Sequence, residues 1–178
     1  MMRSVLLTMC AVFSGIDIHA AGADIDTWKE KLAVSQKAWE AAGKKCQGDY
    51  SYQVTVAFYS GTTQTTTVVV RDHKVTERKF ARGVVAKGKP PAEPVTEWVE
   101  TAADLGKHEG PAAKPKTMDE LYTDAAKLLD GPIAKHEQLT VSFDKDGLLK
   151  ECFTIDTRIA DDNPRKGVAI DRLILAKK

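Results

Sequence analysis

Residues 50–70 read YSYQVTVAFYSGTTQTTTVVV, and this stretch decides the fold. Its first ten residues alternate strictly, and the members that share the more apolar side are Tyr50, Tyr52, Val54, Val56 and Phe58. Ser60-Gly61 then favours a tight turn. The threonines and valines after it are β-branched, which disfavours a helix and suits a strand. The stretch therefore predicts a β-hairpin with one buried face and one wetter face.

Further strands are predicted on the C-terminal side of this hairpin. A tight turn over residues 71–74 leads into a third, more charged strand over 75–80, which we place near a sheet edge. A second hairpin follows later, with strands over 139–143 and 148–156. The last strand is predicted over 168–175.

Two helices are predicted from matching start signals. Thr27-Trp28-Lys29-Glu30 and Thr117-Met118-Asp119-Glu120 both read as capping boxes, in which the threonine hydroxyl accepts from the amide three residues later. Apolar residues recur at helical spacing after each box. Gly43 suits the end of the first helix, and Gly131-Pro132 ends the second.

These elements predict one α+β domain over residues 24–178. We expect an antiparallel β-sheet of about six strands with two helices packed on one face, in the order αβββ-insert-αβββ. The insert covers residues 81–116 and is rich in proline and glycine, which is typical of a functional or irregular loop. A short helix over 96–105, with Trp98 and Leu105 as anchors, is one option within it.

The N-terminus has the pattern of a secretory signal peptide over residues 1–23. Arg3 precedes a short apolar run, and small residues follow, so that cleavage is expected after Ala20 or Ala23. The apolar run is shorter than the roughly 20 residues that a spanning helix needs. We therefore expect a periplasmic or secreted protein. The alternative is a lipid anchor through Cys10, which follows a sequence that resembles a lipobox.

Export bears on the two cysteines of the mature chain, Cys46 and Cys152. An oxidising compartment favours a disulfide between them. Such a bond would close a loop of roughly 100 residues and contribute at most about 4.7 kcal/mol. The alternative is a pair of buried thiols that pack as small apolar groups.

Charge and hydropathy restrict the partners. The chain has 26 Lys and Arg against 25 Asp and Glu, for a formal net charge of +1. A nucleic-acid partner is not expected, because binding phosphates needs a clustered positive field. No run after residue 23 is apolar enough to span a bilayer, so the mature chain is expected to have no transmembrane segment. We expect a monomer whose partner is an unknown protein or small ligand of the envelope.

The sequence predicts no catalytic residue and no cofactor. No serine lies in a G-x-S-x-G motif, and His73, His108 and His136 are isolated rather than spaced as zinc ligands. One group of oxygen-bearing residues is a candidate for a hard cation such as calcium: Asp156, Asp161, Asp162 and Asn163. The alternative is a solvated corner, because Asp and Asn favour turns.

Several short motifs occur in an order that resembles a bacterial family. They are the Trp39 helix end, Tyr50-Ser51-Tyr52, residues 70–75, 117–122, 141–144, 153–156 and 160–162. The order is similar to the family called domain of unknown function sixty-one seventy-four, which is found in exported proteins and lipoproteins. The similarity spans roughly residues 28–175. It implies an exported α+β domain and supplies no catalytic residue.

These observations predict a non-catalytic binding or interaction domain of the bacterial cell envelope. The reasons are export, a sheet with one wet face, and a long insert able to contact a partner. One alternative is a module like a protease inhibitor, in which the insert fills a cleft with Trp98 as its anchor. The other is an enzyme whose residues meet only in the fold.

Overall fold

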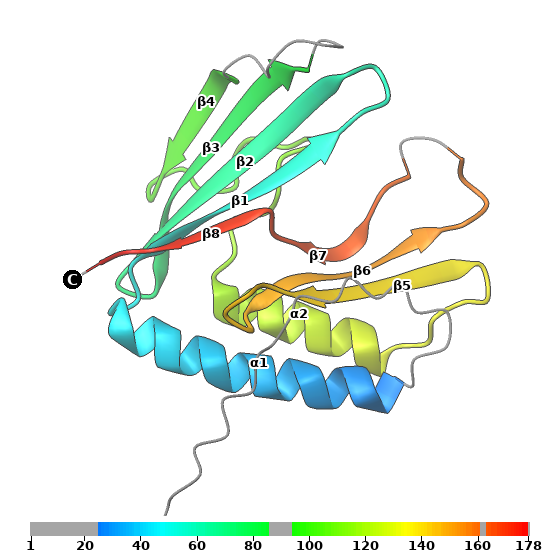
Figure 1. Cartoon of the computed structure of the whole chain (residues 1–178). Coiled ribbons are helices and arrows are strands. Elements are labelled where there is room, and N and C mark those ends of the chain that lie inside the picture. Colours follow the sequence, from blue (N-terminus) through cyan, green and yellow to red (C-terminus); the bar gives the residue numbers. More distant parts are fainter. Residues whose placement is uncertain (1–24, 86–93, 161–162, 178) are drawn as a thin grey trace, which may run out of the picture.

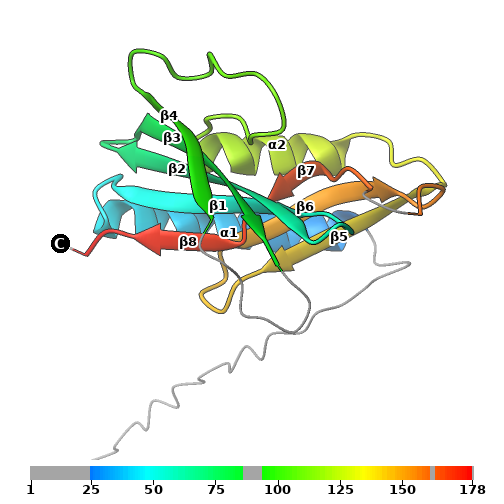
Figure 2. The same ribbon diagram turned by 90° about the horizontal axis from the view of Figure 1, so that it is seen from above.

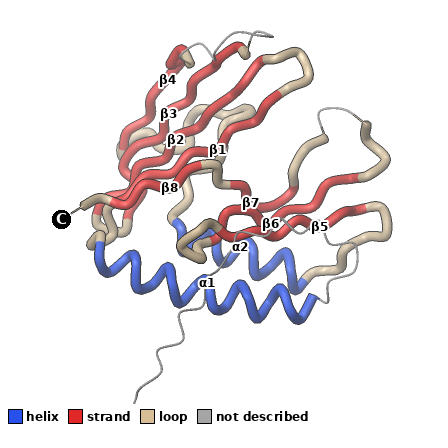
Figure 3. Tube along the Cα trace, in the orientation of Figure 1, coloured by secondary structure: helices blue, strands red, loops and turns tan. Residues whose placement is uncertain are grey.

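The computed structural model describes residues 25–85, 94–160 and 163–177; the predicted signal peptide lies outside these ranges. They form an α+β fold of two helices and eight strands (Figure 1, Figure 3). The helices are α1 (Ile25–Lys45) and α2 (Met118–Asp130). The strands are β1 (Tyr50–Ala57), β2 (Thr62–Arg71), β3 (Lys74–Val84), β4 (Val95–Thr101), β5 (Glu137–Phe143), β6 (Leu149–Asp156), β7 (Lys166–Ala169) and β8 (Arg172–Leu175).

The larger sheet has five strands in the order β4-β3-β2-β1-β8, and all neighbours are antiparallel. The hairpin predicted over residues 50–70 is confirmed, with Tyr50 opposite Val70 and Tyr52 opposite Val68. All four side chains are buried. The sheet twists strongly, so that β4 lies at a steep angle to β1 when seen from above (Figure 2).

The smaller sheet has three antiparallel strands in the order β5-β6-β7. The structure therefore has two sheets with eight strands in all, where a single sheet of about six strands is expected from the sequence. The α+β class, the antiparallel pairing and the two helices are confirmed. The cause lies at Ile170 and Asp171, which divide the predicted last strand. The Ile170 amide donates to Lys150 in the smaller sheet (2.8 Å), whereas the next amide, of Asp171, donates to Gln53 in the larger (2.9 Å).

Both helices lie along the same side of the molecule and pack beneath the smaller sheet and the first half of β1 (Figure 1). Their buried apolar residues join both sheets in one hydrophobic core. Hydrogen bonds link the two helices: the Trp39 indole donates to Asp119 (2.8 Å), and Ser35 and Tyr122 share a bond of 2.7 Å. The core thus fixes the half of the larger sheet that contains Tyr50, Tyr52, Val68 and Val70, which we call the base of the sheet.

The helix-start signals had different outcomes. The capping box at Thr117 is confirmed, because its hydroxyl accepts from the Glu120 amide and the Glu120 carboxylate accepts from the Thr117 amide. The same motif at Thr27 does not cap α1. That helix already includes Ile25, so Thr27 lies inside its first turn.

The predicted insert over 81–116 is partly strand. The third strand continues to Val84, and β4 occupies residues 95–101, where a short helix was considered. Pairing with β3 explains the difference: Trp98 lies opposite Phe80, and Glu100 lies opposite Arg78. The rest of the insert turns back over the sheet and leads into α2 (Figure 2).

The predicted disulfide between Cys46 and Cys152 is wrong, because both thiols are free and buried. The Cys46 thiol donates to the Gly43 carbonyl (3.4 Å), and that of Cys152 points to the Ala125 carbonyl (3.8 Å). Burial raises the pKa of the Cys152 thiol to about 12. Both residues therefore act as small core residues, the alternative stated above. Of the two helices, neither is long and apolar enough to cross a membrane.

Candidate binding cleft between the two sheets

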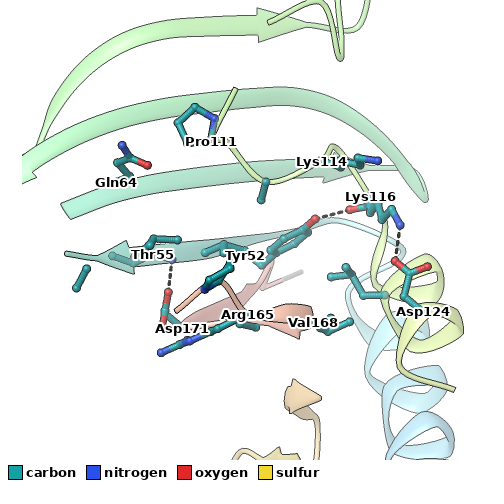
Figure 4. A pocket seen from close by; sticks show the side chains of 18 of the residues that line it. Tyr52, Thr55, Gln64, Pro111, Lys114, Lys116, Asp124, Arg165, Val168 and Asp171 are labelled. Carbon is teal, nitrogen blue, oxygen red and sulfur yellow. Dashed lines mark hydrogen bonds and ion pairs between the residues drawn. The ribbon is translucent and has the colours of Figure 1, made fainter. Parts of the chain in front are cut away.

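A cleft of about 800 Å³ lies between the outer part of the larger sheet and the chain that leads into and out of β7 (Figure 4). We call it the inter-sheet cleft. Its lining comes from β1 and β2, the end of the insert, α2 and β7. The lining residues used below are Tyr52, Val54, Val56, Gln64, Lys114, Lys116, Leu121, Asp124, Arg165, Gly167, Val168 and Asp171.

The apolar floor of the cleft is the inner face of β1. The alternation that buries Tyr50 and Tyr52 against the helices also places Val54 and Val56 on that face. The helices do not reach so far along the strand, and Val56 is 43% exposed. Only residues 50–53 of β1 pair with β8, so among the described residues no strand pairs with the outer half of β1 on that edge. The floor is therefore an uncovered apolar strip.

One wall is the end of the insert, which a buried ion pair holds against the inner face of the larger sheet. Arg78 on β3 makes two parallel bonds to Glu100 on β4, of 2.8 and 2.7 Å. The Glu100 side chain is 0% exposed and also accepts from the backbone amides of Gly106 (2.8 Å) and His108 (2.6 Å). The Arg78 guanidinium and these amides lower the pKa of Glu100 to about 2. The carboxylate therefore binds the returning chain by its backbone.

The same arginine fixes the position at which the insert reaches the cleft. Arg78 donates to the carbonyls of His108 (2.8 Å) and Ala113 (3.1 Å). The Ala113 amide donates to the Thr66 hydroxyl on β2 (3.0 Å). Three residues later, the Lys116 carbonyl accepts from the Tyr52 hydroxyl (2.7 Å). The short segment between Ala113 and Lys116 is thus held at both ends.

Trp98 stabilises this arrangement from within. Its ring stacks on that of His108 at 4.4 Å and on that of Phe80 at 5.4 Å, measured between ring centres. The Arg78 guanidinium lies 4.9 Å from the ring centre of Trp98. The residue expected to anchor an inhibitory insert in a partner is therefore packed against its own chain.

The opposite wall is the chain on both sides of β7. Gly167 has a φ of +139°, and a Cβ there would lie 2.3 Å from the Cys152 carbonyl oxygen. Only glycine therefore allows β7 to approach β6 so closely. Further on, the Asp171 carboxylate accepts from the Thr55 amide of β1, which takes the place of the next strand bond (Figure 4).

The charged groups of the cleft differ in how they are paired. Lys116 binds Asp124 of α2 (Figure 4). Arg165 lies over the Phe153 ring at 4.9 Å, and its guanidinium forms a long ion pair with Glu151, 3.9 Å away. Lys114 is exposed and forms no ion pair within residues 25–85, 94–160 and 163–177. Among the described residues of the lining, cationic side chains therefore outnumber acidic ones.

Gln64 on β2 contributes an unusual polar atom to the lining. Its side-chain oxygen is buried and has no hydrogen-bond partner among the described residues. A buried acceptor without a donor destabilises a protein by about 1–3 kcal/mol. Such atoms call for an explanation, and a bound molecule that donates a hydrogen bond is one.

The predicted cation ligands meet only in part. Asp161 and Asp162 lie outside the described residues. Asp156 is engaged by Arg158, whose guanidinium donates to both carboxylate oxygens (2.9 and 2.6 Å) and holds the pKa of Asp156 well below its usual range. The Asn163 side chain bonds to the backbone of Asp156. Within the described ranges no three acidic, histidine or cysteine side chains gather as metal ligands, and the cation site stays a prediction.

The described lining has the following groups that can transfer a proton: Tyr52, Lys114, Lys116, Asp124 and Asp171. Its residues, as far as the structure describes them, include no histidine, cysteine or serine. Burial raises the pKa of the Tyr52 phenol well above its usual value, and its proton is donated to the Lys116 carbonyl. Asp124 and Asp171 are both engaged by donors. The phenol and both aspartates of the described lining are thus bound to protein groups.

Sequence reasoning did not identify the cleft. The alternation over 50–59 predicted a buried face but not that the helices would cover only half of it. Gln64 lies opposite Val56 on the buried side of the hairpin, and a polar residue at such a position is the one signal the sequence offered.

Comparisons with known proteins give no relative of this chain. No family model, no curated protein and no solved structure matches it. The similarity to the family called domain of unknown function sixty-one seventy-four, inferred from short motifs, stays a prediction.

Proposed function

We propose that this chain is a non-catalytic binding domain of the bacterial cell envelope and that its ligand occupies the inter-sheet cleft. The apolar strip on β1, where Val56 is 43% exposed, carries the proposal together with the buried Gln64 oxygen, which has no donor among the described residues. Burying apolar surface is favourable by about 25 cal/mol per Å². A ligand that covers the strip and donates to Gln64 would bury apolar surface and also give a buried acceptor a donor.

The size and rigidity of the site support this function. Small-molecule sites measure roughly 300–1,000 Å³ and are mostly apolar with a few polar groups. The inter-sheet cleft, at about 800 Å³, lies in this range. Its insert wall is held by the ion pair of Arg78 and Glu100, so little ordering would be needed on binding.

Binding to the cleft is tested with Nile red, a neutral dye that becomes fluorescent in apolar sites. Val56 and Val99 are equally exposed, at 43% and 45%, but only Val56 lines the cleft. A carboxylate on the floor opposes apolar binding, so we expect Val56→Asp to weaken the dye roughly tenfold or more. Val99→Asp is the matched control and should bind as the parent does. Equal binding by both variants would contradict the proposal.

The envelope location rests on the predicted signal over residues 1–23 and has its own test. The full chain is expressed in a bacterium, and the periplasmic fraction is analysed by intact mass. We expect a species that begins after Ala20 or Ala23. Recovery of the uncleaved chain from the cytoplasm would contradict export.

A further inference from the structure

We infer that the ligand of the inter-sheet cleft is an amphipathic anion, an apolar chain that ends in a carboxylate. The inference rests on the proposed binding function and specifies its ligand. The carboxylate would lie at Lys114 and the apolar chain along the floor of β1. No contact in the structure already satisfies this lysine within the described residues.

The charge of the lining favours an anion. Lys114, Lys116 and Arg165 are cationic, and Asp124 and Asp171 are the acidic residues of the described lining. Both acids are engaged, Asp124 by Lys116 and Asp171 by the Thr55 amide. A cationic ligand would be repelled by Lys114 and would have to share each acid with the donor that already binds it. An anionic ligand meets Lys114 directly.

Lys114 is also held in place for this role. The residue before it, Ala113, has both backbone groups bonded, to Arg78 and to Thr66. The residue after it is Pro115, whose ring fixes its own φ. Lys116 is then held through its carbonyl by Tyr52. The backbone at Lys114 is thus ordered before a ligand arrives, which lowers the entropy lost on binding.

The floor requires that the anion also have an apolar part. Val54 and Val56 on β1, Leu121 of α2 and Val168 of β7 all line the cleft. An inorganic anion at Lys114 would leave Val56, which is 43% exposed, in water. An attached hydrocarbon chain covers Val56, and each CH₂ group that it buries favours binding.

The experiment compares two ten-carbon probes of opposite charge, decanoate and decylammonium, as competitors of bound Nile red below their micelle concentrations. We expect decanoate to bind at least fivefold more tightly. Lys114→Glu should weaken decanoate roughly three- to tenfold, in the range of one exposed ion pair reversed, and should strengthen decylammonium. Lys107→Glu, an exposed lysine of the same insert outside the cleft, is the matched control and should change neither.

The outcomes separate this inference from the proposed function. If decylammonium binds as well as decanoate, or if Lys114→Glu leaves both unchanged, the anion is wrong. Nile red that still binds in a Val56-dependent way would then keep the cleft as a binding site. If the dye itself binds without regard to Val56, the proposed function fails first.

Discussion

The two halves of the larger sheet are covered in different ways. At the base, helices cover Tyr50, Tyr52, Val68 and Val70, and the contact is apolar. Toward β4, the insert covers the same face, and the contact is a buried ion pair with backbone groups bonded to it. A helix satisfies its own backbone, whereas a loop brings unpaired amides and carbonyls that need partners. The buried charges are therefore the consequence of covering a sheet with a loop.

A strip between these two covers is left open. The helices pack under Tyr52, and the insert binds Thr66, whereas Val56 further along β1 is still 43% exposed. The inter-sheet cleft is this strip. Its shape depends on both covers, and perturbing each in turn tests how independent they are.

The largest effect is expected from Glu100→Gln. The change leaves the Arg78 charge buried without a counterion, and breaking such a pair lowers the free energy of unfolding by about 3–5 kcal/mol. Urea unfolding of the variant and the parent measures the difference. A loss below 1 kcal/mol would contradict the role assigned to the pair.

Removing both charges sharpens the result. Replacing a buried ion pair by apolar residues is often neutral. Here Arg78→Met with Glu100→Leu should stay destabilised, because the backbone groups of Gly106, His108 and Ala113 lose their partners too. Full recovery in the double variant would show that the pair does not hold the insert.

A slightly smaller loss is expected on the helix side from Leu129→Ala. Leu129 of α2 is buried in the shared core, and such truncations cost about 2–5 kcal/mol. Val34→Ala on α1 is the control, because Val34 is 70% exposed and should change stability little. In hydrogen exchange, Leu129→Ala should weaken protection in both sheets. Loss confined to α2 would mean that the core is not shared.

As the pH falls, the insert should lose exchange protection before the helix-covered half of the larger sheet does. The pKa of Glu100 is about 2 in the fold and about 4.5 ordinarily, so its stabilisation is complete above pH 4.5 and is lost as the pH falls toward 2. We expect the Gly106 and His108 amides to lose exchange protection over this interval while the amides at Tyr52 keep theirs. Simultaneous loss of exchange protection at these amides and at Tyr52 would contradict the conclusion that the insert and the helices cover the sheet independently.

The smallest effect concerns Gln64. Gln64→Met removes a buried acceptor that has no donor in the described structure, so stability should rise by up to about 1 kcal/mol. Binding of ligands that donate a hydrogen bond at that place should weaken. Thermal unfolding measures the first effect, and a drop in stability would show that Gln64 has a structural partner.

Local signals predicted much of the fold. The alternation over 50–59 predicted the hairpin strand, and the capping box at Thr117 predicted the start of α2. The turn before β3 was predicted from Arg71-Asp72-His73-Lys74, and its Asp72 and His73 have positive φ values of 48° and 60°. Each of these signals depends only on residues that are close together in the sequence, so it can be recognised without the structure.

Features that depend on distant residues could not be predicted. Arg78 and Glu100 are 22 positions apart, and a buried glutamate contradicts the usual pattern of a strand. Because of that glutamate and the nearby prolines, the sequence pattern did not predict β4. The break between β7 and β8 depends on which strand each of two adjacent amides meets, Lys150 or Gln53. The inter-sheet cleft depends on these contacts between residues that are far apart in the sequence, so the sequence did not predict it either.

The most direct test of the central claim is to locate a neutral ligand by backbone amide chemical shifts. Octyl glucoside serves as the probe, because its chain can cover the floor and its hydroxyls can donate to Gln64. We predict saturable shifts that are largest at Val54, Val56 and Gln64 on the floor and at Ala113 and Val168 on the walls. Shifts that gather instead at the exposed valines of β4, or that do not saturate, would contradict the inter-sheet cleft as the binding site.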